Sequence, residues 1–199
     1  MAVSQITEGR IDTARLSLHA MLACPARPVG RVVLLGGSNF DLRLKREFLD
    51  SPLARKVTGV FIDYAHTPDA LAHSLAAVRD HLSGHLTCVF GCGGNRDRGK
   101  RPEMGRVAEE LADVVMLTDD NPRSEDGGRI VEDIIAGMRM RPEVIRDREA
   151  AIRSAYGQSG EGDVVLVAGK GHEDYQIVGA ECRRYSDRDV ADRLARGAA

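Results

Sequence analysis

Short apolar runs alternate along residues 57–199 with segments in which apolar residues recur at helical spacing. An apolar run bounded by polar turns is typical of a strand that is buried on both faces, as in a parallel sheet. The sequence predicts such strands at residues 59–64, 86–91, 113–118 and 163–169, with a weaker one at 143–145. Strands separated by helices in this way predict right-handed crossovers and a mostly parallel sheet.

Capping signals and periodic apolar residues predict the helices between these strands. Thr67 is a capping hydroxyl, Pro68 suits the first helical position, and Gly84 is expected to end this helix. The apolar positions are Leu71, Leu75, Val78 and Leu82 in the first helix, Met104, Val107, Ala108 and Leu111 after Pro102 in the second, Ile130, Ile134 and Met138 in the third, Ala151, Ile152 and Ala155 between Asp147 and Gly157 in the fourth, and Val190 and Leu194 after Ser186 and Asp189 in the last.

The predicted fold class is therefore α/β. We expect a Rossmann-like, mostly parallel, doubly wound sheet with a C-terminal hairpin at residues 175–186 that turns at Gly179. Residues 1–56 are a poorly defined N-terminal segment of unknown role, in which residues 29–40 offer a possible strand and glycine turn. We place a domain boundary between this segment and residues 57–199. In a doubly wound sheet, the loops at the carboxyl ends of the strands form the ligand crevice.

Composition and charge narrow the class of protein. The 199 residues are 43% apolar and 29% charged, with a net charge of −2, which is the balance of a globular protein without a basic excess for nucleic acid or a membrane surface. No apolar run is long enough for a membrane span, and the N-terminus does not look like a signal peptide, so the expected location is the cytoplasm. The cysteines are expected to be reduced thiols without a metal; they are Cys24, Cys88, Cys92 and Cys182.

The loop at residues 91–101, GCGGNRDRGKR, combines four glycines with four cations. Glycines let backbone N–H groups approach an anion, and arginine can grip a carboxylate or a phosphate with two N–H groups. The spacing from Gly94 to Lys100 approaches that of a phosphate-binding P-loop. Arg101 stands where Ser or Thr would hold Mg²⁺, so we reject a P-loop here. A mobile charged loop is the other interpretation of this segment.

Three further loops carry side chains that can recognise a small molecule. Asn121 and Arg123 can bind a ligand with both an amine and a carboxylate, although the same motif can be a turn followed by a helix cap. Glu173 can accept a hydrogen bond from an amine, or belong to a glycine turn with solvated charges. Tyr64 and His66 can stack on a planar ring, whereas a lone histidine is more often structural.

Four segments, in this order and spacing, resemble the C-terminal domain of the Mur ligases. They are DYAHTPDAL (63–71), FGCGGNRDRGKRPEMG (90–105), TDDNPR (118–123) and GDVVLVAGKGHEDYQ (162–176). The resemblance covers roughly residues 58–195, and the four motifs together are specific, whereas each alone is weak. It points to the branch of the family that adds meso-diaminopimelate, because relatives that add lysine lack the DNPR motif.

The resemblance implies a pocket for meso-diaminopimelate and part of a nucleotide site. Arg96 and Arg123 would pair with the distal carboxylate of the ligand, while Asn121 and Glu173 would orient its distal ammonium. Lysine lacks this carboxylate and would leave buried cations unpaired. The implied pocket comprises Arg96, Asp120, Asn121, Pro122, Arg123, Gly169 and Glu173, and the implied contacts with the nucleotide's ribose and base come from Asp63, Tyr64 and His66. Taken by itself, Asp63 at a strand end is often a capping group.

The resemblance also implies a reaction in peptidoglycan precursor biosynthesis, the ATP-dependent amide ligation of meso-diaminopimelate to UDP-N-acetylmuramoyl-L-alanyl-D-glutamate. The complete family enzyme uses ATP and Mg²⁺ held by a P-loop domain, and no GxxxxGK[ST] motif occurs in these 199 residues. We therefore expect a truncated ligase that is inactive alone, carries no catalytic or metal-binding residue and binds no cofactor autonomously. The expected partners are meso-diaminopimelate, ATP, the UDP-muramoyl dipeptide and the missing ligase domains, with neither nucleic acid nor a membrane.

Two other functions are open to the same sequence. A stand-alone module could bind an amino acid or a nucleotide through these loops without turnover. A Rossmann-like dehydrogenase domain is disfavoured, because no G-x-G-x-x-G motif lies between a predicted strand and a predicted helix.

Overall fold

A computed structural model describes residues 33–34, 58–80, 82 and 84–195 of the chain. Cys24 and most of the N-terminal segment lie outside the described residues, as does the predicted domain boundary between residues 56 and 57. That boundary stays a prediction.

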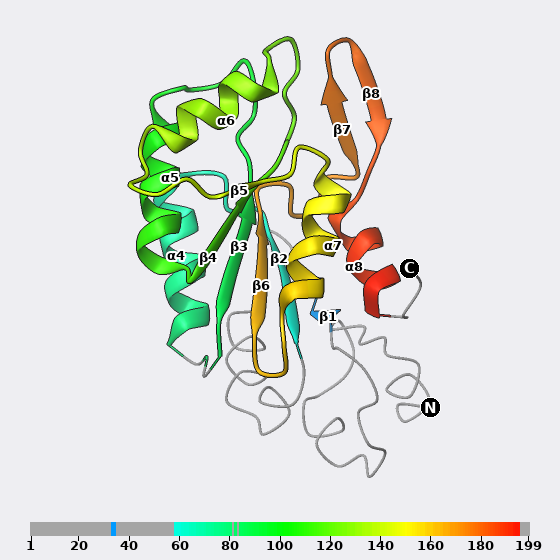
Figure 1. Ribbon diagram of the computed structural model, residues 1–199. Helices are drawn as coiled ribbons and strands as arrows, with labels where there is room; N and C mark the ends of the chain where they lie inside the picture. Colours follow the sequence, from blue (N-terminus) through cyan, green and yellow to red (C-terminus); the bar gives the residue numbers. More distant parts are fainter. Residues whose placement is uncertain (1–32, 35–57, 81, 83, 196–199) are drawn as a thin grey trace.

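A parallel sheet of six strands is the centre of the described structure, in the order β1-β2-β6-β3-β4-β5 (Figure 1). The strands are β1 (Val33–Leu34), β2 (Gly59–Asp63), β3 (Leu86–Phe90), β4 (Val114–Leu117), β5 (Glu143–Val144) and β6 (Val164–Ala168). Neighbouring strands run parallel, with Ile62 beside Val167 and Cys88 beside Leu166. This arrangement confirms the predicted α/β fold, and each strand lies inside its predicted range.

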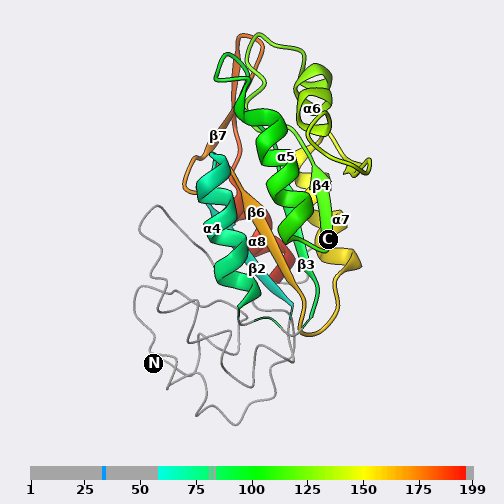
Figure 2. The ribbon, with the colours of Figure 1, turned by 90° about the vertical axis from the view of Figure 1, so that its left-hand side faces the viewer.

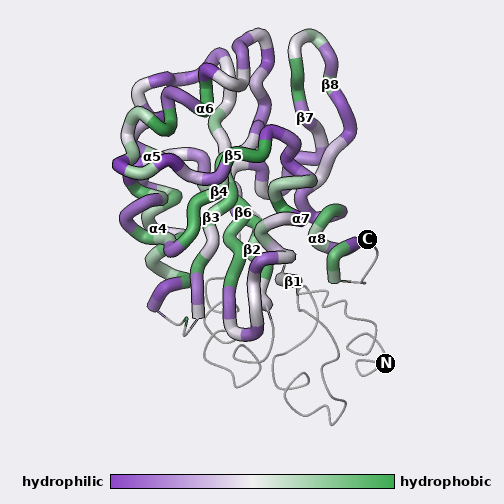
Figure 3. The backbone as a smooth tube through the Cα atoms, viewed as in Figure 1, coloured by the Kyte–Doolittle hydropathy of each residue, from purple (hydrophilic) through white to green (hydrophobic). Residues whose placement is uncertain are grey.

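Helices cover both faces of the sheet, so the sheet is doubly wound (Figure 2). The helices are α4 (Pro68–Arg79), α5 (Lys100–Leu111), α6 (Gly127–Ile135), α7 (Arg148–Gln158) and α8 (Asp187–Ala195). Phe61 and Leu166 pack with α4 and α5, whereas Ile62 and Val167 pack with α7 and α8. The central strands are accordingly among the most hydrophobic parts of the backbone (Figure 3). Among the described helices, none combines the length and the apolar character needed to cross a membrane.

The predicted helix starts are confirmed where a side chain caps the first turn. Thr67 Oγ1 accepts a hydrogen bond from the Ala70 N–H at 3.3 Å, and the Asp147 carboxylate accepts one from Ala150 at 2.8 Å. The Ser186 hydroxyl likewise accepts one from the N–H of Asp189 at the start of α8.

Three predicted helix ends are wrong, and close packing at a glycine explains the first of them. Helix α4 ends at Arg79, well before Gly84, whose added Cβ would lie 2.4 Å from the Gly162 carbonyl oxygen. Helix α6 ends at Ile135 and leaves Met138 outside it, and Gly157 lies within α7. A glycine in sequence therefore marked a crowded backbone contact as readily as a helix terminus.

The C-terminal hairpin is confirmed as β7 (Tyr175–Val178) paired antiparallel with β8 (Glu181–Arg184). Gly179 occupies its turn with a φ of +60°, a conformation that favours glycine. The hairpin stands apart from the large sheet (Figure 1) and is joined to the loop after β4 by a parallel bridge between Val178 and Arg123. This bridge brings the hairpin into contact with the predicted pocket.

The three described cysteines are free thiols, as predicted. Cys88 lies in a buried strand, and Cys92 lies buried against the Met104 sulfur at 3.6 Å. Burial raises the pKa of both buried thiols to about 12, so they stay protonated and unreactive near neutral pH.

Candidate functional site

The four polar loops meet at the carboxyl end of the sheet, the upper end in Figure 1. The loop after β3 touches the loop after β4, where the Gly94 N–H donates to the Asn121 carbonyl oxygen at 2.9 Å. The loop after β6 touches the end of β2, where the Gly169 N–H donates to the Asp63 carbonyl oxygen at 3.0 Å. The structure therefore brings together segments that are about a hundred residues apart in sequence.

Asn121 is the most constrained polar side chain of this region. Its Oδ1 accepts hydrogen bonds from Lys170 Nζ at 3.0 Å and from the Ile177 N–H at 2.9 Å. Its Nδ2 donates to Glu173 Oε2 at 3.0 Å. Since lysine and the backbone N–H can only donate, the oxygen must face them, and the amide orientation is fixed. Asn121 consequently has only N–H left to offer a ligand.

Lys170 is buried beneath Asn121, and its ammonium group also contacts three further residues. Its Nζ donates to the Tyr175 carbonyl oxygen at 2.8 Å and lies 3.7 Å from Asp120 and 3.5 Å from Glu173. Burial lowers the pKa of Lys170, against the attraction of Asp120, and burial raises the pKa of the Asp120 carboxyl, against the attraction of Arg148 and Lys170. The two opposite charges offset each other's desolvation, so neither is available as a free ion.

Arg123 is held in a strained backbone conformation beside Asn121. Its φ is +53°, which is unusual for a residue with a side chain. The hairpin fixes this conformation, because the Arg123 N–H donates to the Ile177 carbonyl oxygen at 3.0 Å and its carbonyl oxygen accepts from Gly179 at 2.7 Å. The half-buried guanidinium donates to the Gly94 carbonyl oxygen at 2.9 Å. Backbone strain that neighbours impose in this way is common at binding sites.

Gly169 and Pro122 contribute backbone shape to the same region. Gly169 has a φ of +114°, and an added Cβ would lie 2.7 Å from Asp120 Oδ2. Pro122 is buried, and its carbonyl oxygen accepts the Glu125 N–H at 3.1 Å to close a turn. Neither residue offers a side-chain group to a ligand.

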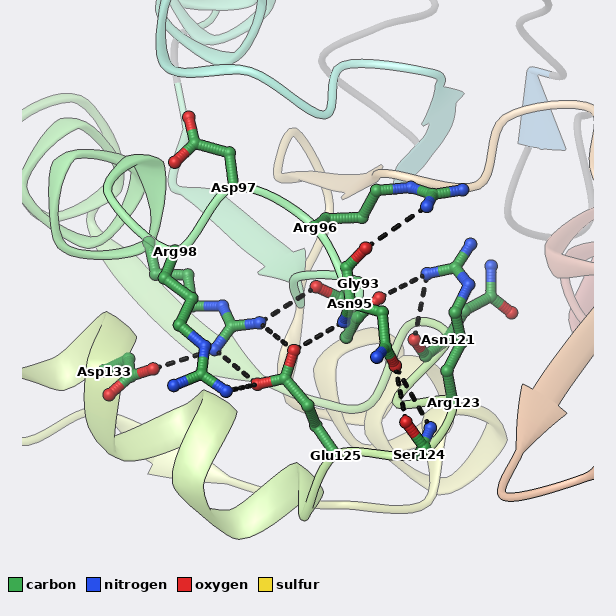
Figure 4. A network of polar contacts seen from close by, with 12 residues as sticks. Gly93, Asn95, Arg96, Asp97, Arg98, Asn121, Arg123, Ser124, Glu125 and Asp133 are labelled. Atoms are coloured by element: carbon green, nitrogen blue, oxygen red, sulfur yellow. Dashed lines mark hydrogen bonds and ion pairs between the residues drawn. The ribbon is translucent and has the colours of Figure 1, made fainter.

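Arg96 differs from the other predicted pocket residues, because its side chain is exposed. Its guanidinium donates to the carbonyl oxygen of Asn95 at 3.2 Å (Figure 4). Arg96 is two residues after Gly94, whose carbonyl oxygen accepts from the Arg123 guanidinium. One short stretch of backbone therefore carries Arg96 and binds Arg123. In Figure 4 their guanidinium groups lie on the same side of that stretch.

The residues with a predicted nucleotide role are only partly together. The ring of Tyr64 lies 4.5 Å from the ring of His66 and 5.2 Å from the ring of His172, measured between centroids. Asp63 instead uses its carboxylate within the fold, where it accepts from the Ala65 N–H and the hydroxyl of Ser74, both at 3.1 Å. The rings are tilted to that of Tyr64, by 59° for His66 and 42° for His172, whereas Asp63 has the capping role that its sequence position suggested.

The described residues do not fit the phosphates and metal of a bound Mg²⁺–ATP. No group of three His, Cys, Asp or Glu side chains among them is arranged to hold a metal ion. The glycine loop that approaches a P-loop instead turns Arg101 inward, where it is fully buried among carboxylates. The buried Arg101 guanidinium is therefore not available to a phosphate group.

Sequence reasoning missed the buried ions that support the loops. Lys170 was not singled out, and Arg101 was interpreted only as one of four loop cations and as the residue that excludes a P-loop. Arg101 bonds Glu125 at 3.0 Å and Asp133 at 2.8 Å, and Glu125 also accepts from Arg98. The signal available in sequence was a cation one or two residues after a glycine in a polar loop, which does not say whether the charge points outward or inward.

Glu125 is expected to make stability depend on pH in acid. The Arg101 guanidinium, with the Asn95 N–H, lowers the pKa of the Glu125 carboxyl from 4.5 to about 2. A carboxyl with a lower pKa in the folded state stabilises the fold fully above pH 4.5, and the contribution is lost as the pH falls toward 2. Glu125→Gln should therefore be less stable than the parent at about pH 6, with the gap closing toward about pH 2. Urea unfolding across this range measures the gap, and a gap independent of pH contradicts the prediction.

Comparison with known proteins adds a family and two relatives. The family described as "Mur ligase, glutamate ligase domain" matches residues 43–171. A curated protein of Synechococcus sp. (strain WH7803), UDP-N-acetylmuramoyl-L-alanyl-D-glutamate--2,6-diaminopimelate ligase, is 50% identical over 156 residues, which are 77% of this chain and 31% of the relative. A solved structure of an enzyme of that name is 45% identical, with a TM-score of 0.65, over 70% of this chain and 29% of its own. The chain thus spans about a third of the length of these relatives.

Proposed function

We propose a function from the premise that this chain belongs to the Mur ligase family and carries its glutamate ligase domain. Its four loops bind meso-diaminopimelate, as part of a ligase of peptidoglycan precursor biosynthesis. The observation that carries the proposal is the fixed side chain of Asn121, held between Lys170 and Glu173 and two residues from Arg123. These groups place N–H donors and a carboxylate next to each other, as a ligand with a carboxylate and an ammonium at one end requires.

The fixed amide changes one role that the family resemblance implies. The resemblance assigns Asn121 to the distal ammonium, but its oxygen is already used by two donors. We therefore assign the remaining N–H of Asn121, with Arg123 and Arg96, to the distal carboxylate. Glu173, whose side chain is 18% exposed, accepts from the distal ammonium. The backbone shape of the pocket depends on three residues that give no side-chain group to the ligand, namely Asp120, Pro122 and Gly169.

This division of roles explains why the pocket would prefer meso-diaminopimelate to lysine. Lysine shares the distal ammonium but has no carboxylate for Arg123 and Arg96. A site with hydrogen-bond donors prepared for a missing group rejects the analogue strongly, because the donors are left without partners. The DNPR motif would thus select the diamino diacid by its second acidic end.

The reaction we propose is the formation of an amide between meso-diaminopimelate and the D-glutamyl carboxylate of UDP-N-acetylmuramoyl-L-alanyl-D-glutamate. In the complete ligase, ATP with Mg²⁺ supplies activation of that carboxylate. The part taken by the described residues is positioning: they hold the distal end of the amino acid, which leaves its other amine free to face the acceptor. Holding a nucleophile in this way can contribute several kcal/mol to lowering the barrier, about 7 or more in favourable cases.

The aromatic face of Tyr64, His66 and His172 is the part of the nucleotide site that we assign to this chain. The rings of His66 and His172 lie 4.5 and 5.2 Å from the ring of Tyr64, so a planar base can stack on one of these rings and touch another at its edge. With the phosphates and Mg²⁺ held elsewhere, we expect these 199 residues alone to show no phosphate release from ATP in the presence of Mg²⁺, meso-diaminopimelate and the UDP-dipeptide. Release above the rate without protein contradicts this expectation. The cytoplasmic location stays a prediction.

Calorimetry with meso-diaminopimelate and with L-lysine tests the pocket. We expect heat of binding for the first ligand and an affinity for the second that is lower by roughly a hundredfold or more. No heat with either ligand, from protein shown to be folded by circular dichroism, overturns the assignment.

A stand-alone binding module is the second candidate, and it predicts the same calorimetry. The remaining two thirds of the Synechococcus ligase, added in trans, separate the two. Phosphate release that depends on this chain and on meso-diaminopimelate supports the ligase. Binding without any such release favours the module.

A further inference from the structure

We propose that Glu125, held by the buried Arg101, is a positioning residue that sets the placement of Arg96 relative to Arg123. The inference rests on the proposed function, because it concerns the two cations that we assign to the distal carboxylate. Neither Arg101 nor Glu125 belongs to the pocket that the family resemblance implies.

Arg101 is a buried, charged residue that binds several acceptors. It lies in the first turn of α5, and its side chain is fully buried. Its guanidinium donates to both oxygens of Glu125 at 3.0 and 3.1 Å, to Asp133 at 2.8 Å and to the Gly93 carbonyl oxygen at 3.2 Å. A buried guanidinium with two carboxylates and a carbonyl is geometrically fixed, because its planar N–H groups match only one arrangement of acceptors.

Glu125 lies in the loop after β4 and binds two residues of the loop after β3, so the fixed side chain holds the two loops together. Its Oε1 accepts the backbone N–H of Asn95, and its Oε2 lies 2.9 Å from Arg98. Asn95 has a φ of +53°, and its side-chain oxygen accepts from both the N–H and the hydroxyl of Ser124. Hydrogen bonds at the backbone N–H and at the side-chain oxygen of Asn95 thus join the two loops. Asn95 directly precedes Arg96.

The same short stretch is held from the other side by Arg123. Gly94, between the contacts of Arg101 and Glu125, accepts from the Arg123 guanidinium at 2.9 Å and leaves no room for a Cβ, which would lie 1.9 Å from the Pro122 carbonyl oxygen. Figure 4 shows Glu125 on one side of this stretch, with Arg96 and Arg123 on the other. Within the described part of the chain, the Arg96 guanidinium donates to the carbonyl oxygen of the neighbouring Asn95. Its placement therefore depends on the conformation that Glu125 imposes on Asn95.

Binding of meso-diaminopimelate to the full chain tests the inference through a double-mutant cycle. Glu125→Gln keeps the size of the side chain and removes its charge. In the parent protein we expect it to weaken binding about tenfold, since charge-assisted contacts that fix the loop are lost. In the Arg96→Ala background we expect less than about a twofold effect, because the positioned group is gone. An effect of equal size in both backgrounds, or none in the parent, overturns the inference.

A matched control and a second variant keep this test decisive. Glu132→Gln makes the same change on α6, in an exposed pair with Arg141, and is expected to leave binding unchanged. If Glu125→Gln does not fold, Ser124→Ala removes one link to Asn95 at an exposed position and should weaken binding about threefold in the parent only. A parent protein that binds no meso-diaminopimelate overturns the proposed function instead, so the two failures are distinguishable.

Discussion

Arg123→Ala is expected to weaken the binding of meso-diaminopimelate by roughly 30-fold or more while leaving the affinity for L-lysine nearly unchanged. The guanidinium lies beside Asn121, whose only free hydrogen-bonding groups are N–H donors, so the two residues form one donor surface for a carboxylate. Removal of Arg123 leaves that carboxylate without its charged partner. Lysine has no such group to lose. Calorimetry with the two ligands measures both affinities.

Three further variants separate the guanidinium from other effects of the change. Arg129→Ala removes an exposed arginine from α6 and should bind like the parent. Arg123→Lys keeps a charge but not the planar pair of donors, and we expect an intermediate affinity. Arg123→Gly also suits the positive φ at this position, so it removes the side chain without adding backbone strain. A glycine variant that binds as tightly as the parent would discredit the role of the guanidinium.

The location of the site was predictable from sequence, because it follows from topology. Parallel strands end at one edge of the sheet, so the loops that follow them must lie near one another. The spacing of strand and helix patterns therefore sufficed to bring residue 94 next to residue 121, and residue 121 next to residue 173, as the hydrogen bonds show. Three of the cap residues, Thr67, Asp147 and Ser186, were predictable for a similar reason, since a cap acts within four residues of sequence.

The direction of individual side chains was not predictable from sequence. Lys170 and Lys100 both follow a glycine in a polar loop, yet Lys170 is fully buried under Asn121, while Lys100 reaches the His66 carbonyl oxygen at 2.7 Å near the surface. Which way a charge points depends on contacts with segments far away in sequence. Gly84 failed as a helix end for the same reason, because its close contacts lie at residue 162, far away in sequence.

Arg148→Met is expected to lower the free energy of unfolding by about 3–5 kcal/mol, because it leaves the carboxylate of Asp187 buried without its partner. The two side chains are fully buried and joined by two hydrogen bonds of 2.8 Å, and Arg148 also donates to the Ala168 carbonyl oxygen at 3.0 Å. Burial opposes the charge on Arg148, but Asp187 outweighs it and raises the pKa of the guanidinium, so Arg148 stays charged at neutral pH.

The same pair connects stability to the site, because Ala168 directly precedes Gly169 at the end of β6. Arg153→Met provides the matched control on α7: Arg153 pairs with Glu149 at 3.0 Å near the surface, and its loss should cost less than about 1 kcal/mol. Replacing both partners, as Arg148→Met with Asp187→Leu, should destabilise less than the sum of the single changes, since no buried charge is left alone. Urea unfolding of the four variants and the parent measures these differences. Additive losses would mean that the two charges contribute independently and that the contact between α7 and α8 does not depend on their pairing.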